Sequence, residues 1–567
     1  MKPSLKFGLC VALASSVPAS ATVLDSNWTE SMFSTNPGGG GHTGLAWAPD
    51  GSDRLFVLEK NGRVRLMSGA LTTGTPVWST FATMSPIQTT SECGLIGIAF
   101  DPDFANNHLV YFFVTVSPTE QQIIRYDAST DVGSNRTVIV PGLPTLGANH
   151  DGGAIGFAAD GMLYWAVGDL GSGVGVDNDL TSLASKVGRA NRDGSLPTGN
   201  PFDDGGGPND DYIFARGMRN PFTMKIQPST GLIWLNVVGD GYEQVFVVRR
   251  GDHGGYNDFE NNQPAATPTL QYITPKIVYP TSNSSVALTL TGASRSGGIA
   301  TFTTNGNHRL RVGSNVSITG VSVASFNGPD QFVASTPSNT TFTVQQIGAT
   351  ETGSGGTANT LAQGRCLTGG EFYDATAAPP AYRGNFFYGD CVSGHLMRAR
   401  IDESTNQVIG VTRWGTGISG QVDMALGPDG ALWYTGGGSA TIFRASYNAS
   451  AQGLIVANRH LRADEGGQVV TTVRLATAPP VDVQVNVART DGDTDVSVDS
   501  GAALTFTPVN WMRPQSVGIV AAADADDNDE QATITVSSQG LPSETLTVHV
   551  LDNQVGPDVI FGDSFEN

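Results

Sequence analysis

A histidine in a glycine-rich loop, followed in the same unit by an aspartate, forms the most informative pair in the sequence. His150 lies in GLPTLGANHDGGAIGF, just before an apolar strand, and Asp169 ends that unit in YWAVGDLG. Because both positions fall at the ends of adjacent predicted strands, their side chains can meet. A carboxylate that accepts one ring N–H fixes the imidazole tautomer and leaves the other nitrogen as a base. The alternative is a loop histidine satisfied by backbone and an aspartate that caps a turn.

A cationic motif, ARGMRNPF, opens a later unit and contains Arg216, Arg219, Asn220 and Pro221. A guanidinium at the start of an inner strand would point into a central channel, where it could hold an oxyanion or a quinone oxygen. The competing interpretation is an arginine that ties a neighbouring unit in place through backbone carbonyls.

Two sets of residues carry oxygen ligands suited to a hard cation. The segment NVVGDGYEQ predicts an exposed turn whose carbonyls and carboxylate can meet calcium, at Gly239, Asp240 and Gly241. Near the C-terminus, acidic residues could converge in a similar way: Asp464, Glu465, the run ADADDNDE and Asp552. The second set does not have EF-hand spacing, and a solvated acidic turn is the alternative there.

The elements that must position these residues recur along the chain. One phrase appears six times in complete or degenerate form: an apolar alternating strand, a turn of the Pro-Asp-Gly type and a second apolar strand. Its copies begin at Gly44, Gly94, Gly152, Asn220, Gly369 and Val422. Since one small sheet cannot bury both of its faces, such units must stack in a ring. The repeat therefore predicts a six-bladed β-propeller, with ligands bound where the inner strands begin.

Two further modules interrupt and extend this pattern. Between the fourth and fifth units, a Thr/Val/Gly-rich alternation predicts a small β module in a loop, an insertion that costs little when its ends lie close together. After Tyr447, period-two alternation predicts a β-sandwich that resembles the Calx-β type. The predicted domains are a signal peptide (1–21), the propeller in two parts (22–284 and 363–447), the inserted module (285–362), the sandwich (455–555) and a C-terminal tail (556–567).

Composition favours an all-β chain and argues against some partners. The 567 residues include 71 glycines but only 15% charged residues, a balance suited to short strands joined by tight turns. The formal charge of −21 repels phosphate backbones and anionic lipid, so we expect neither nucleic acid nor a membrane surface as a partner.

The first residues predict export. Lys2 and Lys6 precede or flank an apolar run too short for a stable membrane anchor, and small residues offer a cleavage site after Ala21. We therefore expect a secreted or periplasmic protein without a membrane span. An oxidising compartment permits a disulfide between Cys366 and Cys391, which leaves Cys93 as the odd thiol.

Five phrases in a common order resemble the soluble glucose/sorbosone dehydrogenases that depend on pyrroloquinoline quinone (PQQ). They are ECGLIGIAFDPDF, NHDGG, GDLG, GMRNP and TGGEFY, and the resemblance covers about residues 30–283 and 363–447. The segments GRCLTGG and GDCVSG also resemble a cysteine pair common in that family, which supports the Cys366–Cys391 disulfide. The resemblance implies an exported enzyme that oxidises aldose sugars or related alcohols and passes electrons to an external acceptor.

The resemblance also implies roles for the residues above. PQQ and Ca²⁺ would lie at the channel mouth, where His150 would take the proton from the sugar hydroxyl and Asp169 would orient His150. Arg219 and Asn220 would contact the cofactor, and Glu92 matches a position beside it. The calcium ligands would come from the turn formed by Gly239, Asp240 and Gly241, largely through carbonyls.

One segment departs from the family pattern. Where basic residues would pair with the PQQ carboxylates, SGQVDMALGPDG offers Gln421 and Asp423, and an aspartate there repels the cofactor unless calcium or a distant arginine compensates. Arg398 or Arg400 is the candidate replacement. Two other functions stay open: a catalytically silent propeller that binds glycans or proteins, its added modules serving adhesion, and a calcium-dependent hydrolase or lactonase, for which few suitably spaced carboxylates are found.

Overall fold

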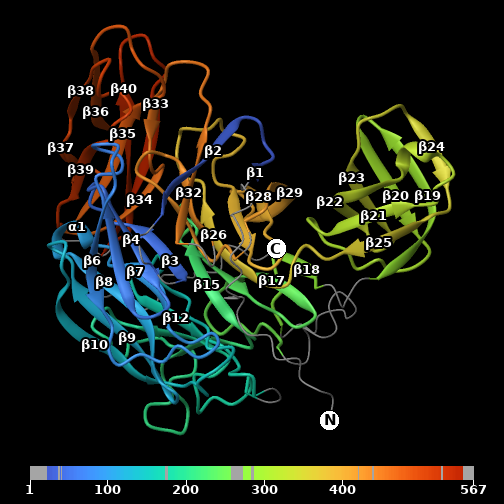
Figure 1. The fold of residues 1–567 in the computed structure, drawn as a ribbon, viewed down its shortest axis with the longest axis horizontal. Helices are drawn as coiled ribbons and strands as arrows, with labels where there is room; N and C mark the ends of the chain where they lie inside the picture. The colour runs from blue at the N-terminus through green and yellow to red at the C-terminus, as the bar shows by residue number, and fades with distance from the viewer. Residues whose placement is uncertain are drawn as a thin grey trace.

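The computed structural model describes residues 22–35, 39, 41–172, 176–256, 272–281, 286–418, 420–436, 440–524 and 528–552 (Figure 1). Within these ranges the helical elements are the single turns α1 (Phe104–Asn107) and η2 (Ala324–Phe326), and the other elements are strands. The all-β prediction is therefore confirmed. The predicted signal peptide and C-terminal tail lie outside the described residues.

Six antiparallel sheets, numbered here in chain order, make up the larger part of the molecule. Sheet 1 contains β3 (His42–Trp47), β4 (Arg54–Glu59), β5 (Arg63–Ser68) and β6 (Val77–Thr83), and sheet 2 contains β7 (Leu95–Phe100), β8 (Leu109–Ser117), β9 (Glu120–Asp127) and β10 (Ser134–Leu143). Sheet 3 contains β11 (Ile155–Phe157), β12 (Leu163–Val167), β13 (Lys186–Ala190) and β14 (Ile213–Arg216), and sheet 4 contains β15 (Pro221–Ile226), β16 (Ile233–Val237), β17 (Tyr242–Val248) and β18 (Ile277–Pro280). Sheet 5 contains β26 (Leu367–Phe372), β27 (Phe386–Asp390), β28 (Leu396–Asp402) and β29 (Gln407–Thr416), and sheet 6 contains β30 (Met424–Leu426), β31 (Leu432–Gly436) and β32 (Thr441–Tyr447).

The six sheets close into a ring through their first strands. Strand β3 contacts β7, β7 contacts β11, and the contacts continue through β15, β26 and β30 back to β3. An apolar cluster fills each boundary between neighbouring sheets, because every sheet has two apolar faces to bury. Large aromatic side chains such as Trp165, Trp234 and Trp433 are fully buried in these clusters. The ring is thus held together by packing between sheets.

The N-terminal strands fasten the ring. Strand β2 (Trp28–Thr35) forms the outer edge of sheet 6 by pairing with β32, with Trp28 opposite Tyr447, and β1 (Thr22–Val23) pairs with β29 in sheet 5. Trp28 also packs edge-to-face on Trp414, with ring centroids 5.3 Å apart. Residues that begin the described chain therefore complete the sheets that end the ring.

A seven-stranded sheet lies between sheets 4 and 5 in sequence and projects to one side of the ring (Figure 1). It contains β19 (Ala287–Ser296), β20 (Ile299–Thr304), β21 (Asn315–Thr319), β22 (Gly328–Ser338), β23 (Thr341–Gln345), β24 (Glu351–Ser354) and β25 (Thr357–Leu361). This inserted module has its own apolar core and contacts the ring mainly through β22 against β29, where Arg413 pairs with Asp330 at 3.1 Å.

The C-terminal module consists of two sheets around one separate apolar core. One sheet has the order β33 (Leu454–Val456), β35 (Gln468–Leu475), β39 (Gln515–Ala521) and β37 (Val496–Ser500). The other has the order β34 (His460–Asp464), β41 (Glu544–Leu551), β40 (Glu530–Ser537), β36 (Val483–Gly492) and β38 (Ala503–Phe506).

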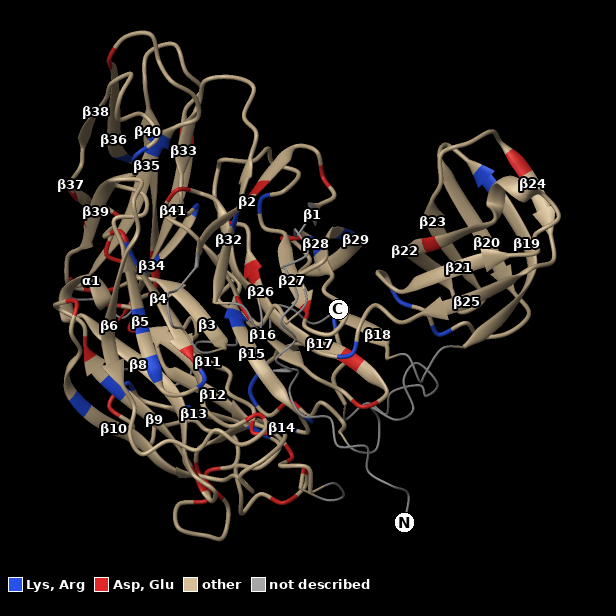
Figure 2. Ribbon diagram, in the orientation of Figure 1, with Lys and Arg blue, Asp and Glu red and all other residues tan. Residues whose placement is uncertain are grey.

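This module contacts all six sheets at one end of the ring, where each first strand stops and the next begins. We call this the turn end, and the opposite end, where the first strands begin, the site end. The contacts are Ser516 to Gly51, Gln468 to Asp103, Asp464 to Arg192, Arg462 to Pro228, His460 to Asp374 and Arg474 to Asp429. Acidic positions are spread over the loops of the ring and both added modules (Figure 2).

Candidate functional site

The His150 and Asp169 side chains meet at the site end of sheet 3. His150 Nδ1 and Asp169 Oδ1 are 2.5 Å apart, and the side chains are 18% and 1% exposed. His150 Nε2 makes no hydrogen bond to the described residues. Burial alone would raise the pKa of Asp169, but the hydrogen bond and charge of His150 outweigh it and lower that pKa. Asp169 is therefore held as a carboxylate against one ring nitrogen.

The backbone around this pair is closely packed. A side chain at Gly168 would place its Cβ 2.2 Å from the carbonyl oxygen of His150, so only glycine fits there. The Asp169 N–H donates to the carbonyl of Arg219 at 2.7 Å, and the Leu170 N–H donates to that of His150 at 3.3 Å. The loops before β11, after β12 and before β15 are thus tied together at one point.

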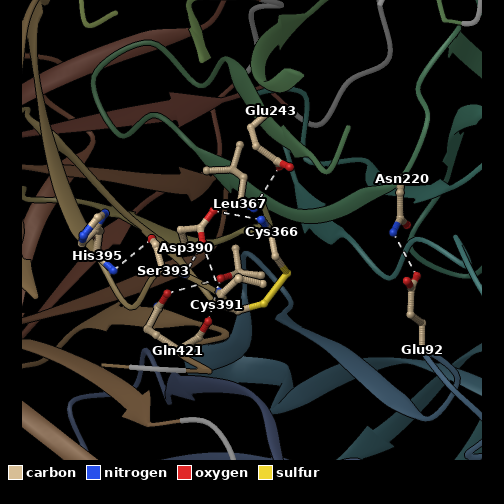
Figure 3. Close-up of a disulfide and its surroundings, with 12 residues drawn as sticks. Glu92, Asn220, Glu243, Cys366, Leu367, Asp390, Cys391, Ser393, His395 and Gln421 are labelled. Atoms are coloured by element: carbon tan, nitrogen blue, oxygen red, sulfur yellow. Dashed lines mark hydrogen bonds between the residues drawn. A yellow bond between two sulfur atoms is a disulfide. The ribbon is translucent and has the colours of Figure 1, made fainter. Parts of the chain in front are cut away.

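Glu92 joins the same point from the loop before β7. Its Oε2 accepts the His150 N–H at 2.7 Å. The same oxygen accepts the Asn220 side-chain amide at 2.9 Å (Figure 3). The Asn220 Oδ1 in turn accepts the Gly152 N–H at 3.2 Å. Burial raises the pKa of Glu92, although His150 and Asn220 oppose that shift. The structure therefore brings Glu92, His150, Asp169 and Asn220 into one constellation.

The two arginines of the GMRNP region lie in different surroundings. Arg219 Nη1 donates to the Val238 carbonyl at 3.1 Å, and its positive charge contributes to the lowered pKa of Asp169. Arg216 instead donates to Asn178 at 2.9 Å and lies over the Phe202 ring. Arg219 therefore belongs to the constellation, whereas Arg216 stabilises the neighbouring loop.

The turn with the predicted calcium ligands, Gly239, Asp240 and Gly241, joins β16 to β17 at the site end. Asp240 is exposed, and the carbonyls of Asp240 and Gly241 accept the Thr281 hydroxyl at 3.1 and 3.3 Å. Among the described residues there is no group of three or more His, Cys, Asp and Glu side chains placed to hold a metal. A cation at this turn would therefore rely on carbonyl oxygens, which stays a prediction.

Asp423 has a cationic partner that the sequence analysis missed. Its Oδ1 lies 3.5 Å from the ammonium of Lys225, and its Oδ2 accepts the Leu45 N–H at 3.1 Å. Lys225 also lies 3.4 Å from Glu371 and donates to the Met424 carbonyl at 2.8 Å. The only sequence signal is a lysine within the otherwise uncharged inner strand β15. One lysine thus links sheets 4, 5 and 6.

The predicted replacement of the basic positions by Arg398 or Arg400 is wrong. Both lie on β28, the third strand of sheet 5, rather than on an inner strand. Arg398 stacks on the Tyr382 ring, 3.8 Å from its centroid, and Arg400 Nη2 donates to the Ile409 carbonyl at 3.4 Å. Strand alternation did not reveal which strand of the sheet these residues occupy.

The disulfide predicted between Cys366 and Cys391 is present, and Cys93 is the free cysteine of the described residues. The bridge joins the start of β26 to the end of β27, and Gln421 lies beside it (Figure 3). Gln421 is fully buried, and its backbone carbonyl accepts the Thr368 hydroxyl at 2.6 Å. Gln421 therefore packs inside the ring and supports β26, the first strand of sheet 5.

Comparison with known proteins finds a family match over the first four sheets of the ring. Residues 42–299 match the family model described as glucose/sorbosone dehydrogenase. The chain is 28% identical over 238 residues to the aldose sugar dehydrogenase YliI of Escherichia coli, a match covering 40% of this chain and 60% of that protein. It is 28% identical over 218 residues to quinoprotein glucose dehydrogenase B of Acinetobacter calcoaceticus, covering 31% of this chain and 45% of that protein.

A solved structure shows the same fold. The apo form of the soluble aldose sugar dehydrogenase from Escherichia coli superposes with a TM-score of 0.50 at 17% identity, over 74% of this chain and 99% of that one. The chain spans about half of the length of the curated relatives named above. No helix in the described part of the chain is long and apolar enough to cross a membrane.

Proposed function

We propose that this chain, which carries a domain of the glucose/sorbosone dehydrogenase family, oxidises aldose sugars or related alcohols with PQQ as hydride acceptor and with Ca²⁺. The single observation that carries the proposal is the buried Asp169 carboxylate holding His150 Nδ1 at 2.5 Å at the site end of the ring. That arrangement leaves Nε2 as a base directed by a fixed tautomer.

The donor set around His150 fits the quinone part of PQQ. Arg219 supplies a guanidinium, which suits an oxygen that gains negative charge, and Asn220 supplies an amide. Glu92 would lie beside the bound group and fix Asn220 and the His150 backbone through the hydrogen bonds described above. The chemistry that PQQ supplies when bound is acceptance of a hydride from the substrate carbon.

The role of the protein's own residues is to hold the substrate and move its proton. His150 Nε2 takes the proton of the hydroxyl group on the carbon that is oxidised, and the ring becomes an imidazolium. Asp169 keeps Nδ1 protonated throughout and stabilises that cation, because a buried carboxylate interacts strongly with a charge at hydrogen-bond distance. Arg219 stabilises negative charge that develops on the opposite side.

Calcium in this proposal is held at the turn of Gly239, Asp240 and Gly241, next to Val238, whose carbonyl binds Arg219. The 420–424 segment offers the carboxylates of PQQ no arginine: Gln421 is buried, and Asp423 shares Lys225 with Glu371. Calcium therefore has a larger share of the carboxylate charge to balance than in a site with two arginines.

We also interpret the ring of six sheets as a six-bladed β-propeller, the C-terminal module as a β-sandwich, and residues 1–21 as a signal peptide. Supporting observations are the cyclic contacts of the first strands, the two sheets around one core, and the basic and apolar residues that precede Ala21. The protein would then act outside the cytoplasm and pass electrons to an external acceptor.

The test is reconstitution of the purified full chain with PQQ and CaCl₂. We expect a shifted quinone absorbance, loss of binding on chelation, and dye reduction that depends on an added aldose. Absence of binding at micromolar PQQ would contradict the proposal and favour the alternative, a silent propeller that binds glycans or proteins.

The variant that isolates the base is His150→Ala. We expect it to retain PQQ and lose at least two orders of magnitude in turnover, since general-base catalysis contributes roughly 10²–10⁴-fold. His308→Ala, in the inserted module, is the matched control and should keep the wild-type rate. Unchanged turnover in His150→Ala would remove this residue from the mechanism.

A further inference from the structure

Beneath His150, a buried cysteine and a buried aspartate connect the two loops that carry the site. The Cys93 Sγ lies 2.9 Å from Asp151 Oδ2, and both side chains are almost fully buried. Cys93 follows Glu92 in sequence, and Asp151 follows His150. The same two loops therefore meet twice. One residue earlier in each loop, the His150 N–H donates to Glu92 Oε2 at 2.7 Å.

The remaining hydrogen bonds of Asp151 are also internal. The Thr145 hydroxyl donates to Asp151 Oδ1 at 2.5 Å, and the Gln121 amide donates to the Asp151 carbonyl at 3.0 Å. Gln121 in turn accepts the Thr115 hydroxyl at 3.2 Å. Burial and the neighbouring Asp151 charge both raise the pKa of the Cys93 thiol, so its sulfur keeps the proton that it donates.

The backbone of His150 is the part that needs such support. His150 has a φ of 57°, in the left-handed region that a residue with a side chain adopts only when its surroundings hold it there. Two sets of contacts keep the His150 backbone in this conformation. Glu92 accepts the His150 N–H, and Cys93 and Thr145 bind the side chain of the next residue, Asp151. A shift of the loop would move the imidazole away from Asp169.

We propose that Cys93 and Asp151 form a thiol–carboxylate clip that sets the position of the His150 imidazole. Both are positioning residues rather than catalytic residues, because neither faces the reacting atoms. This inference rests on the proposed function for its effect on turnover, but the imidazole position itself is independent of that function.

The test compares Cys93→Ala, Cys93→Ser and Asp151→Asn in the full chain. Nuclear magnetic resonance of ¹⁵N-histidine-labelled apo-protein, with His150→Gln to assign the signal, reports the ring nitrogens without any cofactor. We expect Cys93→Ala and Asp151→Asn to change the His150 ring signals and their pH titration, and Cys93→Ser, which keeps a donor, to restore the wild-type pattern. Thr471→Val, a buried change in the C-terminal module, is the control.

In the reconstituted enzyme, we expect kcat in Cys93→Ala to fall roughly tenfold to a hundredfold with a smaller change in KM, since misplacement of a catalytic group by about 1 Å has that cost. Wild-type His150 signals in both Cys93→Ala and Asp151→Asn would overturn the clip. Should Cys93→Ala fail to fold, the isosteric Asp151→Asn decides alone. If wild-type protein binds no PQQ, the proposed function fails while the imidazole signals still decide the clip.

Discussion

The two modules added to the ring are attached in opposite ways. The C-terminal module contacts a turn of every sheet, through side chains such as the half-buried Arg192 and the buried Asp374. The inserted module contacts chiefly the outer strand of sheet 5, through the partly exposed Arg413–Asp330 pair and the side chains of Val312 and Phe332. Each module nevertheless has an apolar core of its own.

This difference shows that the number of chain connections to the ring does not determine how extensively a module is bonded to it. The inserted module is joined to the ring at both of its ends, yet its attachment surface is small. The C-terminal module is joined at one end, yet it is bonded around the whole turn end. We therefore expect the C-terminal module to be part of the ring's stability, and the inserted module to be close to an independent unit.

Deleting the modules should give the largest contrast. A chain ending at Ser450 loses all contacts between this module and the turn end. The six named above alone, at about 1 kcal/mol each, predict a loss of roughly 6 kcal/mol in the free energy of unfolding of the ring. Replacing residues 286–362 by a short Gly-Ser linker should leave that free energy nearly unchanged. Denaturant unfolding of both proteins measures it, and equal losses would contradict the comparison.

A single side chain at the C-terminal junction should come next. Arg192 binds Asp464 at 2.7 Å and Asp101 at 3.2 Å, and Asp101 is buried. Arg192→Ala leaves two carboxylates without their guanidinium, which predicts a loss of about 2–3 kcal/mol. Arg192→Lys, which keeps the charge but not the two-pronged geometry, should lie between wild type and alanine. If Arg192→Ala lowers the free energy of unfolding by less than the roughly 1 kcal/mol of an exposed ion pair, the junction is solvated.

Acidification should weaken the same junction by a smaller amount. Burial, together with the electrostatic effect of Arg462 and His460, lowers the pKa of His549 to about 4. Between that value and the ordinary pKa of about 6.5, the unfolded chain binds a proton that the folded chain does not. Stability should therefore fall between pH 7 and pH 5, by about 1 kcal/mol after allowance for partial exposure. His549→Gln should remove this part of the fall, measured by melting curves at both pH values.

The inserted module should show the smallest effect. Arg413 and Asp330 form a pair at 3.1 Å in which the aspartate side chain is 48% exposed. Arg413→Ala should cost about 0.5 kcal/mol or less, because exposed ion pairs contribute little. The loss should shrink further in high salt. A loss as large as that of Arg192→Ala would mean that the inserted module is coupled to the ring after all.

The repeated phrase made much of the architecture predictable. Strands β3, β7, β11 and β15 each begin within or next to a copy that starts at Gly44, Gly94, Gly152 or Asn220. Such strands can be predicted from the sequence, because apolar residues must line both faces of a sheet that is packed between two others. The proximity of His150 and Asp169 followed from the same register, since both lie at ends of adjacent strands.

Other parts of the site had no local signal. The bond from Asn220 to Glu92 spans 128 residues, and the bond from Lys225 to the carbonyl of Met424 spans 199. Contacts of this kind depend on how the sheets are rotated about the ring axis, which periodicity within one strand does not report. For the same reason, alternation on β28 did not reveal that Arg398 faces Tyr382.

The pairing of β2 with sheet 6 affects how the protein folds during synthesis. The segment Trp28–Thr35 leaves the ribosome before any other strand of that sheet, yet its partner strand ends at Tyr447. Strand β2 therefore cannot pair with β32 until more than four hundred further residues have been synthesised and folded. A chain whose synthesis stops before β32 would leave β2 without its partner strand. Of the strand pairs in the ring, β2 with β32 joins the residues that lie farthest apart in sequence.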